Sequence, residues 1–472
     1  MKKKTTTKLK PKSAPKKEIA VKKVKWIPKT ARGVKDVLPE DEVLREKVKD
    51  IAFEYARYYQ YGHIETPIFE DTELFLRAVG EATDIIEKQM YTFKTEGGTK
   101  LTLRPEGTAP VARAYIEHGM QNLPQPVKLF YMGPMFRHEA PQRGRLRQLT
   151  QFGLEVLGDS SPSYDAEVIV VIFNILKQLK VKDLVVEINS IGDKSCRTVW
   201  RNKLKDYYRN KLSKLCKDCK NRYQVNPFRL LDCKEKECID LRSGAPAMLD
   251  NLCSACSTHF KGVLEFLDEM EIPYALSPYL VRGLDYYTRT VFEVFSNPVF
   301  FEKQVSAQEV EKIGSGESEE KKGTEISPLA LAGGGRYDDL VKLLGGKDTP
   351  GLGGAIGVDR VVDCIEGSTS SQRSEAPVKV FLVQLGVIAK RKLMKLREGL
   401  RKEKISSAES FGRDSIKAQL KIADRLGAEF VLILGQREVL DETIILRDMH
   451  TGSQEVIPLA KIFDEIKRRL KK

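Results

Sequence analysis

Residues 136–158 (FRHEAPQRGRLRQLTQFGLEVLG) contain the side chains best suited to bind a ligand. The pattern predicts a strand, a basic loop and a second strand, because the central residues are too highly charged to be buried. Side chains alternate between the faces of a strand, so Gln151, Gly153 and Glu155 share one face. Two polar side chains with a glycine between them leave room for a ligand. An ordinary half-solvated antiparallel strand shows the same alternation, so both interpretations stay open.

Six of the eight cysteines lie between Cys216 and Cys256. This clustering argues against a chain-wide disulfide framework and indicates a local site in a reducing compartment. Paired Cys-x2-Cys segments have the spacing that tetrahedral Zn²⁺ favours. The expected ligands of a structural Zn²⁺ are the cysteines of these pairs: Cys216, Cys219, Cys253 and Cys256. Cys233 and Cys238 are alternative ligands, and unliganded thiols on helices are the other interpretation.

Helices and strands must position these residues. Apolar residues recur at helical spacing from Leu44 to Tyr59, after Pro39 opens the pattern and before Gly62 ends it. Further strands are expected at 100–105, 127–133 and 151–158, with helices at about 163–180 and 197–215. Beyond a linker at 366–376, strands and helices alternate, which predicts a separate small α/β domain.

The length of 472 residues and the 41% hydrophobic content allow two or three globular domains. No apolar run approaches the ~20 residues that span a bilayer, and the start lacks the features of a secretory signal. We therefore expect a protein of the cytoplasm. The expected parts are a Lys-rich tail at 1–30, a large domain at 31–365 and a C-terminal domain at 376–472. Within the large domain, a helical Cys-rich insertion is expected at about 197–262 and a surface loop at about 302–327.

Positive charge is concentrated in the tail. Residues 1–30 hold twelve lysines and one acidic residue, Glu18, and so contribute +11 of the net charge of +14. Such a segment cannot bury enough apolar surface to fold alone. It is suited to hold a polyanion such as tRNA through counterion release. A solubilising extension or an address label is the alternative.

Four segments, in order, resemble class II aminoacyl-tRNA synthetases in the form typical of histidyl-tRNA synthetases. Residues 136–158 resemble motif 2, and 32–71 (RGVKDVLPED through IETPIFED) resemble motif 1. The segment LVRGLDYYTRTVFEVF (280–295) resembles the histidine-specific signature. GGGRYDDLV (333–341) with GLGGAIGVDRVV (351–362) is similar to motif 3. The resemblance runs from about residue 32 to the C-terminus. It implies an α+β fold: a class II antiparallel sheet flanked by helices, with the Cys-rich insertion and a C-terminal α/β anticodon-binding domain.

The resemblance also implies an activity, namely ATP-dependent ligation of L-histidine to tRNA(His) through a histidyl-adenylate, with Mg²⁺ on the ATP and a homodimeric protein. Arg137 and Arg282 would be the catalytic cations, since charge accumulates on the phosphate oxygens during phosphoryl transfer. The histidine-binding residues would be Glu81, Thr83, Gln151, Glu155, Tyr286 and Tyr287. ATP would contact Arg137, Glu139 and Arg360, and the tRNA would contact Gln142 and Arg147. Arg104 and Glu106 would belong to the same active-site wall.

Three positions depart from the family pattern. Asp359 stands where Glu is usual, Leu149 where many members have an aromatic residue that stacks on adenine, and Ala140 where Arg is usual. Three alternative functions follow from the same residues. A catalytically silent paralogue, such as the regulatory subunit of ATP phosphoribosyltransferase, would share the core. A sister synthetase would use another amino acid, and a non-enzymatic tRNA-binding protein would use only the tail and the C-terminal domain.

Overall fold

The computed structural model describes residues 28–79, 86, 89–139, 144–296, 330–366 and 378–470. Glu81, Thr83, Ala140 and Gln142, nearly all of the Lys-rich tail, and the expected surface loop at 302–327 lie outside these ranges. In the part that is described, no helix is both long and apolar enough to cross a membrane. The chain divides into two compact units. Among the described residues, one unit holds those within 28–37, 60–173 and 184–357, and the other holds those within 38–59, 174–183 and 358–470.

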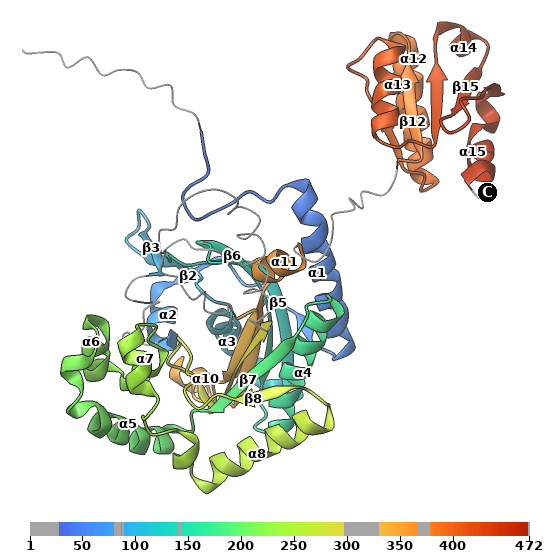
Figure 1. Ribbon diagram of the computed structural model, residues 1–472. Coiled ribbons are helices and arrows are strands. Elements are labelled where there is room, and N and C mark those ends of the chain that lie inside the picture. The colour runs from blue at the N-terminus through green and yellow to red at the C-terminus, as the bar shows by residue number, and fades with distance from the viewer. Residues whose placement is uncertain are drawn as a thin grey trace, which may run out of the picture. The chain divides into compact units, whose positions relative to one another are not determined.

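The first unit is built on an eight-stranded sheet with the order β1-β5-β6-β11-β10-β9-β7-β8 (Figure 1). Its strands, in that order, are Gly62–His63, Val127–Phe136, Gln148–Leu157, Gly351–Gly357, Ala332–Arg336, Thr288–Ser296, Leu184–Ser190 and Tyr274–Leu276. All neighbours from β5 to β7 are antiparallel, and only the two edge strands pair in parallel. The expected antiparallel sheet is therefore confirmed.

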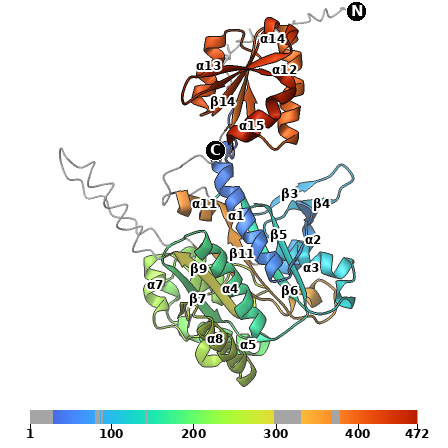
Figure 2. The ribbon, with the colours of Figure 1, turned by 90° about the vertical axis from the view of Figure 1, so that its right-hand side faces the viewer.

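One face of this sheet is covered by α4 (Pro162–Gln178), as Figure 2 shows. The apolar side chains of β6 point to this face, and Phe152, Leu154 and Val156 are fully buried. A Cβ placed on Gly354 of the neighbouring strand would meet Val168 and Ile172 of α4. Helix α4 therefore packs directly against Gly354 of β11 on one face of the large sheet. The opposite face of this sheet contacts other elements.

A three-stranded sheet and two helices belong to the same unit. The sheet has the order β2-β4-β3, with strands at Phe69–Asp71, Lys100–Leu103 and Tyr91–Lys94. Helix α2 (Thr72–Val79) follows β2, and α3 (Thr108–Glu117) follows β4. Short helical turns complete the region at Met120–Asn122 (η2) and Leu340–Leu343 (α10). The turn between β4 and α3 places residues 104–107 beside the large sheet.

The Cys-rich insertion is helical, as expected. It contains α5 (Lys194–Arg209), η3 (Leu212–Lys214), α6 (Lys217–Val225), η4 (Pro227–Asp232), α7 (Lys236–Arg242), η5 (Leu249–Asn251) and α8 (Ser254–Glu269). Figure 1 shows α5, α6 and α7 gathered together, away from the strands. The insertion has its own small core, in which Trp200 stacks on Phe228 at 4.8 Å between ring centroids. The insertion can therefore hold a fixed shape of its own.

The second unit contains a five-stranded sheet, β13-β12-β14-β15-β16. Its strands are Ser407–Glu409, Val380–Gln384, Phe430–Leu434, Thr443–Asp448 and Gln454–Pro458. Alternate residues of β12 and β14 face two different cores, one shared with α12 (Val387–Lys402) and α15 (Ile462–Leu470), the other with α13 (Ile416–Arg425). Helices on both faces confirm the expected α/β domain. Two short helices complete it, α14 (Gln436–Leu440) and η6 (Leu459–Lys461).

Two further helices of the second unit contact each other. Helix α1 (Pro39–Tyr58) begins with proline at its first position, as the sequence predicts, and α11 (Val358–Glu366) follows β11 directly. Arg45 of α1 donates to Asp359 of α11 at 2.8 Å. Asp359, one of the departures from the family pattern, therefore anchors α1 to α11.

Candidate active site

One face of β6 carries Gln151, Gly153 and Glu155, and the sequence alone allowed this face to be solvated. In the structure, Gly153 and Glu155 are buried and Gln151 is half-buried. Glu155 pairs with Gly353, which pairs with Gly335 on the next strand. One row further along, Gly153 pairs with Ala355, and Ala355 pairs with Gly333. Residues paired across a sheet share a face, so the floor of the site consists of small residues. Long side chains from the flanking strands can therefore lie over it.

Glu155 is only 1% exposed, which excludes the half-solvated strand as an explanation of its pattern. Its carboxyl group accepts a hydrogen bond from Thr108 Oγ1 at 2.8 Å and one from the hydroxyl of Tyr337, with Tyr131 Oη at 3.4 Å. Burial outweighs these donors and raises the pKa of Glu155 to about 8. A carboxyl group with a pKa of about 8 is mostly uncharged at pH 7, so it can share its proton with a basic ring.

Two tyrosines stand beside this acid. Tyr286 and Tyr287 are 5% and 6% exposed, and their ring centroids lie 4.7 Å apart. The hydroxyl of Tyr286 donates to Glu106 at 3.3 Å. Tyr286 also packs edge-to-face on Tyr337, whose hydroxyl reaches Glu155. Aromatic walls with a buried acid make a pocket for a flat polar ring.

Glu106 helps to build this wall from the β4–α3 turn. Its carboxylate accepts from the backbone N–H groups of Thr108 and Ala109 at 2.6 and 3.0 Å, which caps α3. Arg104, expected in the same wall, donates instead to the carbonyl oxygens of Thr66 and Pro134 at 2.7 and 2.9 Å. Arg104 therefore links the segment that contains Thr66 to the strand that contains Pro134.

Arg282 enters the same site from the other side. It forms an ion pair with Glu293, which lies on β9 opposite Gly333. A Cβ on Gly333 would lie 2.7 Å from Arg282 Nη1, so this guanidinium lies directly over the glycine floor. Its Nε is buried and has no hydrogen-bond partner among the described residues. The proximity of Glu293 raises the pKa of Arg282 against the opposing effect of burial, so the group stays cationic.

Arg137 lies just beyond the end of β5, and its Nε donates to Pro105 O at 2.8 Å. Its ion pair with Glu139 is long, at 4.0 Å, so Glu139 only loosely neutralises it. Gln151 shares the face of Glu155 and pairs with two glycines, Gly133 and Gly357. The terminal groups of Arg137 and Gln151 can therefore contact a ligand.

The remaining expected residues have other surroundings. Arg147 donates to the carbonyl oxygens of Arg32 and Glu139 at 3.1 and 3.4 Å, and it packs on Gly33. Arg360 lies in the first turn of α11, in the second unit. Glu81, Thr83 and Gln142 lie outside the described residues.

Sequence reasoning missed four side chains of this site: Thr108, Tyr131, Tyr337 and Glu293. Tyr131 was within reach of prediction, because it faces Gly153 across the hairpin that the sequence did predict. Tyr337 directly follows the glycine-rich segment 333–336. This segment indicates a place near the site less strongly than the hairpin does for Tyr131. Thr108 and Glu293 left no signal in the spacing, since only the fold brings them to Glu155 and Arg282.

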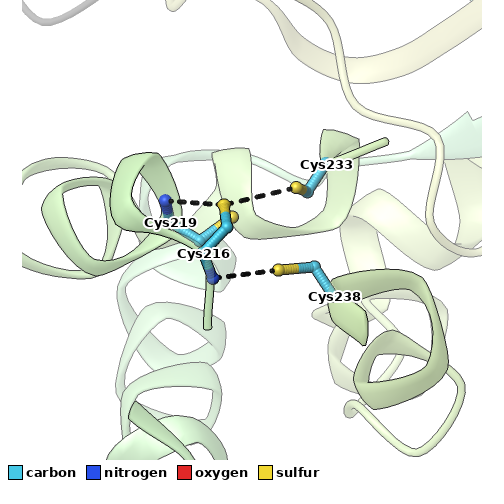
Figure 3. A group of neighbouring side chains, drawn as sticks. All are labelled: Cys216, Cys219, Cys233 and Cys238. Atoms are coloured by element: carbon cyan, nitrogen blue, oxygen red, sulfur yellow. Dashed lines mark hydrogen bonds between the residues drawn. The ribbon is translucent and has the colours of Figure 1, made fainter. Parts of the chain in front are cut away.

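The structure corrects the expected zinc ligands. The two Cys-x2-Cys pairs do not meet: Cys216 and Cys219 gather with Cys233 and Cys238, as Figure 3 shows. Cys253 and Cys256 gather instead with Asp193 and Cys196. Each pair lies at the start of a different helix, α6 or α8, and the two helices bring their cysteines to different neighbours. All eight cysteines have free thiols.

The site thus combines a ring-binding pocket that contains a near-neutral acid with two guanidinium groups for oxyanions. That combination suits a ligand with a basic ring at one end and a carboxylate or phosphate at the other.

Comparison with known families and proteins shows which proteins this chain resembles. A family model described as histidyl-tRNA synthetase matches residues 33–302, and one described as an anticodon binding domain matches residues 379–469. The histidine–tRNA ligase of Natranaerobius thermophilus is 41% identical over 440 residues, which cover 93% of this chain and 98% of that protein. The histidine–tRNA ligase of Desulfitobacterium hafniense is 43% identical over 444 residues, with the same coverage.

Solved structures agree. The apo histidyl-tRNA synthetase of S. aureus superposes with a TM-score of 0.72 at 35% identity, covering 93% of this chain and 100% of that one. A Bacillus halodurans structure described as an ATP phosphoribosyltransferase regulatory subunit/histidyl-tRNA synthetase has a TM-score of 0.57 at 20% identity, covering 86% of this chain and 98% of that one. The second likeness shows the fold alone. The family model spans more than half of the chain, and the relatives match it almost from end to end, so this chain belongs to the histidyl-tRNA synthetase family.

Proposed function

We propose that this chain joins L-histidine to tRNA(His) in two steps that consume ATP. In the first step, a carboxylate oxygen of histidine attacks the α-phosphorus, and the bond from that phosphorus to the pyrophosphate leaving group breaks. In the second step, a terminal ribose hydroxyl of the tRNA attacks the carbonyl carbon of the histidyl-adenylate, and AMP leaves. The observation that best supports the proposal is the position of Glu155, buried among tyrosines on the same glycine floor as Arg282.

Selection of histidine would rest on Glu155 and Tyr287, which hold the two imidazole nitrogens, while Tyr286 lines the pocket. Thr108, Tyr131 and Tyr337 contact Glu155 from the protein side, so an amino acid without a ring nitrogen would leave the buried carboxyl group short of its one ligand partner. A missing hydrogen bond at a buried polar group costs about 1–3 kcal/mol, more when the group is charged, and this cost rejects apolar amino acids. The ammonium group would be bound by Gln151 together with Glu81 and Thr83.

The phosphate chemistry would rest on Arg137 and Arg282. Arg137 binds the α-phosphate and the carboxylate of histidine, because a planar guanidinium can contact two oxyanions at once. Arg282 approaches from the opposite side with a buried Nε that lacks a partner in the described chain. Mg²⁺ would supply further positive charge at the β- and γ-phosphates. Glu139 and Arg360 would complete ATP binding.

The tRNA would contact Gln142 and Arg147 near its acceptor end, and the domain at 376–472 near its anticodon. Lys417, Lys421 and Arg425 form an exposed basic row on α13 that suits a phosphate backbone. The same proposal includes a catalytic domain at 31–365, a homodimer in the cytoplasm, and a structural Zn²⁺ in the insertion that takes no part in the reaction.

The test is exchange of labelled pyrophosphate into ATP, measured with each of the twenty amino acids. We expect exchange with histidine only. Arg282→Gln should lower the rate of histidine-dependent exchange about 10²- to 10³-fold. Removal of one preorganised donor to a developing negative charge has an effect of this size in other enzymes. Arg401→Ala, which breaks an exposed pair with Glu398 on α12, is the matched control and should keep the full rate.

Each alternative function gives a different result. A silent paralogue or a tRNA-binding protein gives no exchange, and a sister synthetase gives exchange with another amino acid. Exchange that ignores histidine would refute the proposal. Normal exchange in Arg282→Gln would refute the role of Arg282 alone.

A further inference from the structure

The insertion brings four thiols together from three short elements. The Sγ atoms of Cys216, Cys219, Cys233 and Cys238 all lie within 4.8 Å of one another. The first two come from the start of α6, Cys233 follows η4, and Cys238 lies in α7 (Figure 3). Cys219, Cys233 and Cys238 are 0%, 7% and 2% exposed. The cluster is therefore enclosed on most sides.

The spacing of these sulfurs fits a metal ion. Four sulfurs at about 2.3 Å from a tetrahedral Zn²⁺ stand roughly 3.8 Å apart. Cys216 Sγ and Cys233 Sγ are 3.9 Å apart, whereas a disulfide needs about 2.0 Å. The N–H of Cys219 donates to Cys216 Sγ at 3.4 Å, and the N–H of Cys216 donates to Cys238 Sγ at 3.5 Å. Such backbone donors orient and stabilise thiolate ligands.

We propose that Cys216, Cys219, Cys233 and Cys238 hold one structural Zn²⁺ through four thiolates. A set of four buried thiolates is closed and leaves no open position for a substrate, as in structural zinc sites generally. Zinc binding by this cluster does not depend on the reaction proposed above, whereas the positioning role described below rests on it.

The bound ion would clamp the turn that supports the tyrosine pocket. Cys219 and Cys233 stand on either side of η4, so a metal ion fixes the ends of the segment between them. From this segment, Asn226 Nδ2 donates to Asp285 Oδ1 at 2.9 Å, and Arg229 Nη1 donates to Gly283 O at 3.3 Å. Both acceptors lie in the loop between Arg282 and Tyr286. We therefore assign the zinc cluster a positioning role for that loop.

The second group, Asp193, Cys196, Cys253 and Cys256, is not part of the proposal. Asp193 Oδ1 already accepts from the backbone N–H of Cys196 at 2.9 Å and from Ser195 Oγ at 2.8 Å. These contacts cap the start of α5 and account for the carboxylate without a metal ion.

The first experiment measures the zinc content of the full-length protein by elemental analysis. The wild-type chain is compared with Cys233→Ser and with the control Cys364→Ser, whose cysteine lies outside both groups. We expect Cys233→Ser to hold one zinc fewer per chain than the wild type, and Cys364→Ser to match the wild type. Equal zinc content in wild type and Cys233→Ser, including none in either, would overturn the proposal.

X-ray absorption at the zinc edge of the wild-type protein decides the matter if Cys233→Ser does not fold. With one zinc per chain, we expect four sulfur ligands at about 2.3 Å. Two zinc ions per chain would fill both groups and support the proposal. A single zinc with three sulfurs and one lighter atom would place the ion at Asp193 and overturn it, and so would a protein without zinc.

The positioning role predicts a selective kinetic effect. Loss of the ion in Cys233→Ser should lower kcat/KM for histidine by up to about a hundredfold, since a 1 Å misplacement of a binding group can cost that much. The KM for tRNA should stay unchanged, and the KM for histidine should rise. A metal-free protein with an unchanged KM for histidine would overturn the positioning role.

Discussion

Replacing Tyr337 with Phe tests whether Glu155 shares a proton with the bound ring. Tyr337 is 1% exposed, and its hydroxyl donates to Glu155. Phe keeps the ring and its packing on Tyr286 but removes the donor. The hydrogen bond favours the ionised carboxylate, so its loss must raise the pKa of Glu155 further.

The size of the shift follows from the hydrogen bond. A hydrogen bond to a charged group contributes about 1.5–3 kcal/mol, and one pKa unit corresponds to about 1.36 kcal/mol. The pKa of Glu155 is raised to about 8 in the wild-type protein. In Tyr337→Phe it should rise by about one to two further units, because Thr108 and Tyr131 still donate.

The assay is kcat/KM for histidine in pyrophosphate exchange as a function of pH. In the proposed complex, Glu155 and the imidazole share one titratable proton, so binding needs a protonated Glu155 with a neutral imidazole, or an ionised Glu155 with a protonated imidazole. Free imidazole is neutral above about pH 6.5, and free Glu155 is protonated below about pH 8. The profile should therefore be bell-shaped, with its maximum between these values.

Tyr337→Phe should move only the upper limb of this profile to higher pH, because the lower limb belongs to the free amino acid. Tyr115→Phe is the matched control: Tyr115 is 2% exposed, and its hydroxyl donates to the neutral Gln125 at 3.2 Å. An upper limb that stays in place in Tyr337→Phe, or moves equally in Tyr115→Phe, would refute the reasoning.

Three further predictions concern the floor, the frame and the tail. Gly353→Ala should raise the KM for histidine strongly, because the new Cβ would overlap Glu155 Oε2; an unchanged KM would contradict the glycine floor. Arg336→Met should lower the free energy of unfolding in urea by up to about 3–5 kcal/mol, because it removes the guanidinium from the buried Asp165 and leaves this carboxylate with His259 Nε2 at 3.3 Å. Deleting residues 1–27 should weaken the salt dependence of the KM for tRNA, if the lysines bind its backbone; an unchanged slope would favour a solubilising tail.

Local patterns were sufficient to predict the strands and helices around the site. The alternation of residues 151–156 predicted that Glu155 lies on one face of the strand and that Phe152 and Leu154 lie on the other face. The regular register of β6 with its two neighbours confirms this alternation. The proline at position 39 marked the start of α1, which begins there. These predictions succeeded because period and capping depend on neighbouring residues alone.

The surroundings of Glu155 could not be predicted in the same way. Thr108 and Tyr337 lie 47 and 182 positions from Glu155 in the sequence. Local spacing does not encode such contacts, and they arise only when α3 packs near β6 and β11 brings β10 into the same sheet. The raised pKa of Glu155 follows from the same burial, so it too depends on the tertiary fold.

The cysteines show the same limit. The spacing Cys-x2-Cys correctly marked Cys216 with Cys219 and Cys253 with Cys256 as neighbours. It could not show which pairs meet, because that choice depends on the path of η4 and α7 between them. Cys233 and Cys238, which have no such spacing, complete the first group instead.

A crystal structure with L-histidine and a non-hydrolysable ATP analogue bound tests the central claim most directly. The account predicts an imidazole nitrogen within about 3 Å of a Glu155 carboxyl oxygen, with the guanidinium groups of Arg137 and Arg282 on the α-phosphate and the histidine carboxylate. An imidazole turned away from Glu155, or an α-phosphate out of reach of both arginines, would contradict it.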